Sequence, residues 1–121
     1  MSVIAVLGTL DSKGAEHAFV ADQIRLRGHE VLLIDVGTGD DPTVDPGVSR
    51  FEVAASAAVD LQQVLDRKDR GECVAAMTRS APVLLAQLVA ESRISGVISL
   101  GGGGGTAIAT AAMRALPTGF P

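Results

Sequence analysis

The sequence of 121 residues contains no tryptophan, no tyrosine and only three phenylalanines. Its ten lysines and arginines are outnumbered by fourteen aspartates and glutamates, and they form no basic cluster. Proteins that bind nucleic acids need positive surface for the phosphates and often aromatic rings for the bases. These shortages therefore predict a protein with no nucleic-acid partner.

Cysteine and long apolar runs are scarce as well. Cys73 is the single cysteine, which excludes a disulfide framework and a thiolate zinc site. The N-terminus enters a short apolar segment without a basic leader, and we expect no apolar run to approach the ~20 residues that cross a bilayer. We therefore expect a cytoplasmic protein with no membrane segment and no metal site.

The composition of the whole chain, 47% hydrophobic and 20% charged, is typical of one globular domain. Residues 2–8 and 30–36 are short and almost wholly apolar, as buried strands are, and residues 14–28 between them have helical periodicity. The helical stripe that should face the core consists of Ala15, Phe19, Val20, Ile24 and Leu26. This unit predicts two parallel strands joined by a right-handed crossover.

The second half of the chain predicts a loop, a series of helices, and one more strand and helix. Residues 37–50 are a loop by their Gly, Pro and Asp content. Pro82 should break one long helix, with Ser80 capping the helix that follows. The expected helices cover residues 50–57, 59–69, 71–79, 81–93 and 106–116, and the third strand covers residues 94–100.

The fold class expected from this alternation is α/β, a parallel sheet with helices on both faces and strand order 2-1-3. A three-stranded sheet that ends on a helix leaves one strand edge uncovered. We therefore expect the chain to be part of a longer protein.

Five consecutive glycines, Gly101 to Gly105, separate the third strand from the last helix. Backbone N–H groups and the helix dipole attract anions at such a position, and Thr106 adds a hydroxyl donor. The run is not a Walker motif because no lysine follows it, and Thr106 stands where the dinucleotide fingerprint needs its third glycine. We predict a phosphate-binding loop, and the alternative is a flexible turn that binds nothing.

A second candidate loop, GTLDSKG at residues 8–14, follows the first strand. In strand order 2-1-3 it faces the glycine run across one crevice, at the edge of the sheet where open α/β folds bind ligands. Lys13 can neutralise phosphate charge and Asp11 can hold Mg²⁺. The alternative is that Asp11 or Ser12 caps the first helix.

The end of the second strand completes the candidate site. Asp35 stands where an acidic residue of a dinucleotide fold bonds a ribose hydroxyl, although it can equally be a solvated strand end or a cap. The loop after it, with Gly37, Thr38 and Gly39, can lie close to a base or sugar. The candidate nucleotide-binding residues are Gly8, Thr9, Asp11, Lys13, Asp35, Gly101, Gly102, Gly103, Gly104, Gly105 and Thr106.

Other polar residues yield no site. Asp41, Asp45 and Glu52 match three positions of a calcium loop, but Pro46 replaces its obligatory glycine, so we interpret them as a solvated acidic loop.

The two histidines and the cysteine are also expected to be structural. His17 and His29 have no partner at a catalytic spacing and are predicted to be ordinary surface or helix-end residues. Cys73 is predicted to be a small core residue. No catalytic residue can be assigned.

The segments VIAVLGTLDSKGAE, MTRSAPVLLAQLVAESRISGVISLGGGGGTAIAT and MRALPTGFP together resemble the Tm-one-like family, the ATP-binding domain named after the tomato mosaic virus resistance protein. The resemblance covers nearly the whole chain. It implies a Rossmann-like N-terminal domain that binds ATP, a homodimer, and a parent chain with a C-terminal domain.

Two positions depart from the family pattern. The glycine loop of the family commonly reads G-G-S-G-G-T, and here Gly103 replaces the serine and loses one hydroxyl donor. Ala15 stands where an acidic residue often follows the lysine and glycine, although Glu16 remains.

The leading hypothesis is a nucleotide-binding domain that takes ATP, with or without Mg²⁺, between the two loops. One alternative is an assembly module in which helices at residues 50–93 form a dimer face and the crevice stays empty. Another is the non-catalytic half of a larger enzyme.

Overall fold

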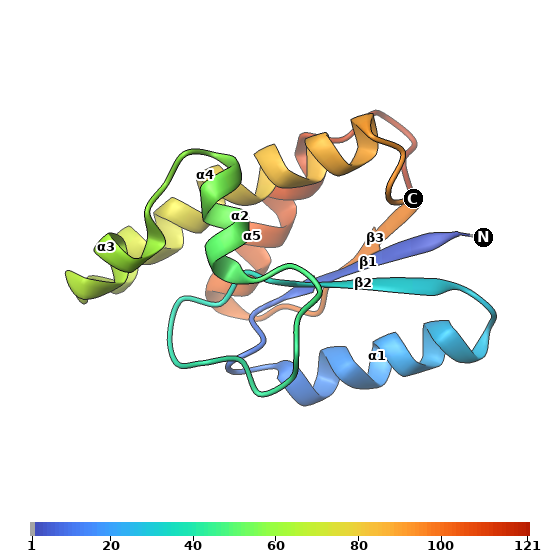
Figure 1. Ribbon diagram of the computed structural model, residues 1–121, viewed down its shortest axis with the longest axis horizontal. Helices are drawn as coiled ribbons and strands as arrows, with labels where there is room; N and C mark the ends of the chain where they lie inside the picture. Colours follow the sequence, from blue (N-terminus) through green and yellow to red (C-terminus); the bar gives the residue numbers. More distant parts are fainter. Residues whose placement is uncertain (1) are drawn as a thin grey trace.

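The computed structural model describes residues 2–121. Three parallel strands, β1 (Val3–Gly8), β2 (Glu30–Asp35) and β3 (Gly96–Ile98), form an open sheet of order β2-β1-β3 (Figure 1). The predicted α/β class and strand order are confirmed. The third strand is shorter than predicted, and its Val97 N–H bonds the carbonyl of Pro121 at 3.0 Å.

Helices flank the sheet on both faces (Figure 1). They are α1 (Gly14–Leu26), α2 (Arg50–Ser56), α3 (Leu61–Asp66), α4 (Arg70–Ala90) and α5 (Gly103–Arg114). Because side chains alternate along a strand, Ala5 and Leu7 enter the larger core with α2, α4 and α5, whereas Val6 joins a smaller core on the side of α1. The strands all end at one edge of the sheet, where the connecting loops gather.

The short helix α2 begins at a capping box. The Glu52 N–H donates to Ser49 Oγ at 3.1 Å, and the Ser49 N–H donates to Glu52 Oε1 at 3.1 Å. These reciprocal bonds satisfy amides that the first helical turn leaves free. The carboxylate of Glu52, one of the three residues that match a calcium loop, is thus used in starting a helix.

The predicted core face of α1 is wrong for most of its residues. Phe19 and Leu26 are 60% and 78% exposed, and the buried positions are Gly14, His17 and Ala21. Small residues at 14 and 21 let the helix lie close to the sheet, and the hydrogen-bonded His17 ring lies between them. Phe19 and Leu26 therefore turn outward, whereas Ile24 packs against the smaller core.

The predicted break at Pro82 is also wrong, because α4 runs unbroken through it. Buried apolar residues continue on both sides of the proline, with Met77 before it and Leu85 after it, so packing holds the helix together. Ser80 is not a cap, since its hydroxyl donates to the Ala76 carbonyl one turn earlier at 2.7 Å.

Helix α4 also overturns the expectation that no apolar run reaches membrane-spanning length. It is long and apolar enough by length and composition, and the only such helix among residues 2–121. Core helices meet the same criterion, and α4 packs against α2, α3 and α5. Its hydropathy is accounted for by this core position.

Replacing Pro82 should stabilise the domain. Pro82→Ala supplies the missing N–H to the Thr78 carbonyl within an otherwise regular helix, so we expect the free energy of unfolding to rise by about 1–3 kcal/mol. Urea unfolding followed by circular dichroism measures this. Pro117→Ala, at an exposed position outside the helices, is the control and should change stability little. A destabilised Pro82→Ala variant would contradict our account of α4.

Candidate functional site

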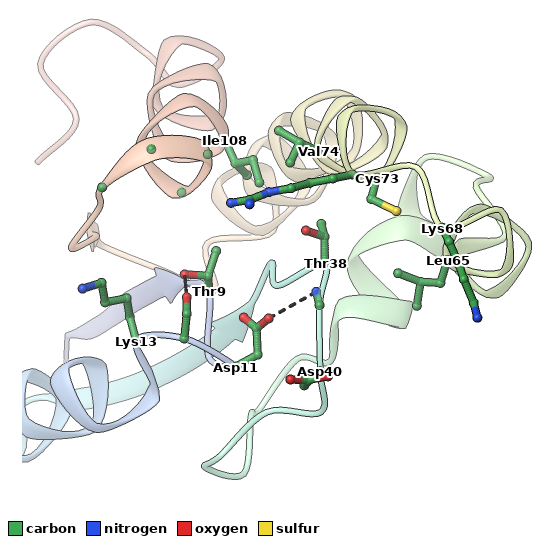
Figure 2. Close-up of a pocket in the computed structure, with 17 residues that line it drawn as sticks. Thr9, Asp11, Lys13, Thr38, Asp40, Leu65, Lys68, Cys73, Val74 and Ile108 are labelled. Atoms are coloured by element: carbon green, nitrogen blue, oxygen red, sulfur yellow. Dashed lines mark hydrogen bonds between the residues drawn. The ribbon is translucent and has the colours of Figure 1, made fainter.

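A cleft of about 710 Å³ opens at the edge where the parallel strands end. Its walls come from the loop after β1, the loop after β2, the segment from α3 to the start of α4, and the first turn of α5 (Figure 2). The volume lies within the range of ordinary small-molecule sites. The topology thus brings together the two loops that the sequence analysis singled out.

The first turn of α5 forms the glycine wall of the cleft. The helix begins at Gly103, three residues earlier than predicted, with Gly102 as an N-cap that has no side chain to offer. The Thr106 N–H bonds the Gly102 carbonyl at 2.9 Å and closes the first turn. The amides of Gly103, Gly104 and Gly105 precede this bond, so they have no intrahelical acceptor.

The space around these glycines differs: a side chain would fit at Gly104 and Gly105 but not at Gly101. A Cβ on Gly104 would lie 3.5 Å from a Val74 methyl, and a Cβ on Gly105 would lie 3.5 Å from the Thr9 methyl. A Cβ on Gly101 would lie 2.3 Å from Thr106 Oγ1. Gly101 therefore makes room for Thr106, and neither of these two predicted site residues lines the cleft.

The loop after β1 forms the facing wall, with Thr9, Asp11, Ser12 and Lys13 lining the cleft (Figure 2). The half-exposed Lys13 ammonium lies 4.0 Å from Glu16. The N-cap of α1 is Lys13 itself, without a side-chain cap bond, so the alternative that Asp11 or Ser12 caps this helix is wrong.

Asp11 joins this loop to the loop after β2. Its Oδ2 accepts a hydrogen bond from the Gly39 N–H at 3.1 Å. Its Oδ1 is buried and has no hydrogen-bond partner among residues 2–121. One oxygen of the carboxylate is thus left without a protein donor, on the side of Gly37.

Asp35 lies beneath the cleft rather than in it. The side chain is 1% exposed, and its Oδ1 accepts from the Leu10 N–H at 3.2 Å and the Gly37 N–H at 2.8 Å. Burial raises the pKa of Asp35 and nearby Asp11 adds to the rise, whereas the two amides and Arg50 oppose it. Asp35 thus holds two loops in place and is not positioned to contact a ribose.

Gly8 is likewise a packing residue. A Cβ on Gly8 would lie 2.1 Å from His17 Nε2, so glycine is needed to accommodate the imidazole. The expectation that His17 is an ordinary surface or helix-end residue is wrong, because its side chain is fully buried and hydrogen-bonded at both nitrogens. His29 is exposed, as expected.

Several residues of the site were missed by sequence reasoning. Arg50 is buried, and its guanidinium donates to the carbonyls of Gly39 and Asp40 at 2.8 and 3.1 Å, which fixes the loop after β2. The loop after β2 also adds Asp40 to the cleft, and the missed cleft-lining residues from α3 to α5 are Leu65, Lys68, Arg70, Val74 and Ile108. No local pattern distinguishes them, since only the packing of α3, α4 and α5 brings them to the cleft.

Cys73 also lines the cleft, at its helical wall. Its side chain is almost fully buried, and burial raises the pKa of the thiol. A protonated, buried thiol is unreactive. The prediction of a small core residue is confirmed.

These features define an α/β domain with an open parallel sheet and a glycine-lined cleft at the ends of its strands. The chain belongs to the family described as "Uncharacterised protein family (UPF0261) N-terminal domain", whose sequence model matches residues 2–121.

Relatives of the chain occur in bacteria and in tomato. A UPF0261 protein of Clostridium tetani is 42% identical over 118 residues, covering 98% of this chain and 29% of the relative. A UPF0261 protein of Mesorhizobium japonicum is 45% identical over 123 residues, which cover 100% of this chain and 30% of the relative. The ToMV susceptible protein tm-1(GCR26) of Solanum lycopersicum is 29% identical over 130 residues, which cover 95% of this chain and 17% of the relative. The resemblance to the Tm-one-like family is confirmed.

The chain spans about 29% of the length of the Clostridium tetani relative and 17% of the tomato relative. The relatives therefore contain long segments outside the matched region, as the expectation of a longer parent protein requires.

The raised pKa of Asp35 predicts a pH dependence of stability. The folded chain binds the Asp35 proton more tightly than the unfolded chain, so this group lowers the free energy of unfolding as pH rises from 3.8 through the raised value. Asp35→Asn keeps an acceptor for the two amides and removes the charge. We expect the variant to gain stability relative to the natural chain as pH rises above about 4, where the natural chain begins to lose the Asp35 proton.

Urea unfolding at a series of pH values measures the difference. Asp22→Asn is the control, because Asp22 is 71% exposed and ion-paired on the surface of α1. Parallel stability profiles for Asp35→Asn and the natural chain would contradict the assignment of a raised pKa.

Proposed function

We propose that the domain binds ATP, with the phosphates on the uncapped first turn of α5. The observation that supports this most is that the amides of Gly103, Gly104 and Gly105 adjoin the same cleft as Lys13. Free helix N-terminal amides and a lysine form a recurrent phosphate-binding combination.

The charges of the cleft favour an anionic ligand. Lys13, Lys68 and Arg70 line it, against the carboxylates of Asp11 and Asp40. The whole chain has a net charge of −4, so this excess of cations is local. Three cations around one cleft suit a polyphosphate better than a neutral ligand.

The remaining wall suits the nucleoside. Leu65, Val74 and Ile108 offer apolar surface on the helical side of the cleft, opposite Lys13 and Thr9 (Figure 2). Apolar walls with a few polar groups are typical of sites for flat organic ligands. We propose that the base lies against these side chains and that Thr38 lies near the sugar.

Mg²⁺ fits this arrangement only together with the nucleotide. Residues 2–121 contain no group of three His, Cys, Asp or Glu side chains that could hold a metal ion by themselves. Mg²⁺ is commonly bound by one or two carboxylates plus substrate phosphates. The carboxylate of Asp11, which lines the cleft, is the group we propose for this role.

The assembly alternative receives less support. Alanine and valine dominate the helices between residues 50 and 93, which suggested close packing against a second copy, but Val53, Ala76 and Ala81 are buried in the domain's own core. The other alternative, that chemistry takes place in the remainder of the parent protein, is compatible with ATP binding here.

ATP binding can be tested with one pair of variants. We expect ATP to raise the melting temperature more than NAD or inorganic phosphate does, and Lys13→Met to weaken ATP binding about tenfold because a phosphate loses its cation. Isothermal titration calorimetry measures the affinity. Arg25→Met is the matched control, because Arg25 also forms an exposed i,i+3 ion pair on α1 but lies outside this cleft.

Equal losses in Lys13→Met and Arg25→Met would show only a general effect of net charge. The absence of any ATP effect on the melting temperature of the natural chain, with and without Mg²⁺, would contradict the proposed function.

The glycine turn predicts opposite effects on stability and affinity. For Gly104→Ala the added methyl makes an ordinary contact with Val74, so stability should stay equal or rise by about 0.5–1 kcal/mol. The same methyl leaves less room for a phosphate to reach the free amides of the first turn of α5. We therefore expect ATP affinity to fall about tenfold.

Gly103→Ser is the matched control for the loop. A Cβ at Gly103 meets no other atom within 4 Å, and serine restores the hydroxyl of the common family pattern. We expect this variant to keep or increase ATP affinity. Unchanged affinity in Gly104→Ala would argue against phosphate binding at the first turn of α5.

A further inference from the structure

The buried ring of His17 connects the two facing walls of the cleft. Its Nδ1 lies 2.8 Å from the carbonyl oxygen of Lys13, and its Nε2 lies 3.1 Å from the backbone nitrogen of Leu100. Lys13 ends the loop after β1, and Leu100 directly precedes the glycine run. No other hydrogen bond within the described chain joins segment 8–17 to segment 99–106.

These partners determine the state of the imidazole. A backbone N–H can only donate, so Nε2 must be the acceptor of the Leu100 bond. A carbonyl can only accept, so Nδ1 must carry the proton that bonds Lys13. Both bonds exist together only in the neutral ring with its proton on Nδ1. In the imidazolium form both nitrogens are donors, and the bond to Leu100 is lost.

The surroundings give the ring little freedom to find another arrangement. His17 is fully buried, and its Nε2 occupies the space in which a Gly8 side chain would stand. A ring held in this way cannot swing out to bond another group without opening the packing between α1 and β1. The state of Nε2 therefore acts directly on Leu100.

We propose that neutral His17 is the positioning residue that sets the spacing between the Lys13 wall and the glycine wall, and that its protonation releases the glycine wall. The role in ligand binding rests on the proposed nucleotide function. The hydrogen-bond link itself does not. Affinity for the nucleotide polyphosphate should then decline as His17 gains a proton.

Few charged groups lie near the His17 imidazole and could affect its protonation. On α1 the nearest are Lys13 and Glu16, which are ion-paired with each other, and Asp22 and Arg25 form a second pair further along the helix. The strands β1 and β3 and the loop that contains Leu100 contribute no ionisable side chain, whereas β2 ends at Asp35, opposite Gly8 in the sheet. Asp35→Asn is therefore the control that separates a pH response of Asp35 from one of His17.

The first experiment uses no nucleotide. Nitrogen-15 NMR of the chain between about pH 8 and about pH 5 reports the tautomer of His17 and the Leu100 amide. We expect the Nδ1–H tautomer at the higher pH, and a Leu100 amide shift that follows the His17 titration. An Nε2–H tautomer, or a Leu100 amide that ignores the titration, would overturn the proposal.

The second experiment measures ATP affinity in matched variants over the same pH range. His17→Gln places a side-chain carbonyl where it can accept from Leu100 but cannot titrate, so affinity should stay near the natural value at high pH and fall less at low pH than in the natural chain. The fall that remains comes from protonation of the terminal phosphate of ATP and is common to all variants. His17→Asn can still donate to Lys13 but does not reach Leu100, so its affinity should be about tenfold weaker than the natural value at high pH, and the difference should shrink at low pH.

His29→Gln removes the exposed histidine and should leave both the affinity and its pH profile unchanged. A fall in affinity at low pH that is as large in His17→Gln as in the natural chain would overturn the proposal. If ATP fails to bind the natural chain while Leu100 still follows His17, the proposed function fails and the link between the walls stands.

Discussion

The parallel pairing of β1 with β3 is the constraint on which the candidate site depends. Ile4 lies opposite Gly96 and Val6 opposite Ile98, so the chain leaves both strands at the same edge of the sheet. The lysine-bearing loop and the glycine run, almost ninety positions apart in the sequence, therefore become facing walls. An antiparallel β3 would carry the glycine run to the opposite edge, because only parallel strands end on the same side.

Buried polar groups then fix the loops that the strands deliver. Asp35 accepts from the amides of Leu10 and Gly37, and Arg50 donates to the carbonyls of Gly39 and Asp40. His17 adds the bond that crosses between the walls. Each group satisfies backbone atoms that loops cannot pair among themselves, so the cleft is ordered by the protein's own hydrogen bonds.

The incorrect predictions share one physical cause. The apolar stripe assigned to α1 ignored the possibility that small residues and a hydrogen-bonded His17 would face the sheet instead of Phe19 and Leu26. The break assigned to Pro82 gave more weight to one missing hydrogen bond than to a buried apolar face that continues past it. In both places local propensity was outweighed by tertiary packing, which a single sequence does not display.

The sequence by itself determined the α/β class, the order of the elements and the candidate loops, because β-branched runs, helical periodicity and five adjacent glycines are local signals. Only the tertiary structure decided that Asp35, Gly8 and Thr106 support the cleft without lining it. It also decided that α3 and α4 supply a wall and that His17 joins two loops. Such roles depend on which distant segments touch, and that is set by sheet register and helix packing.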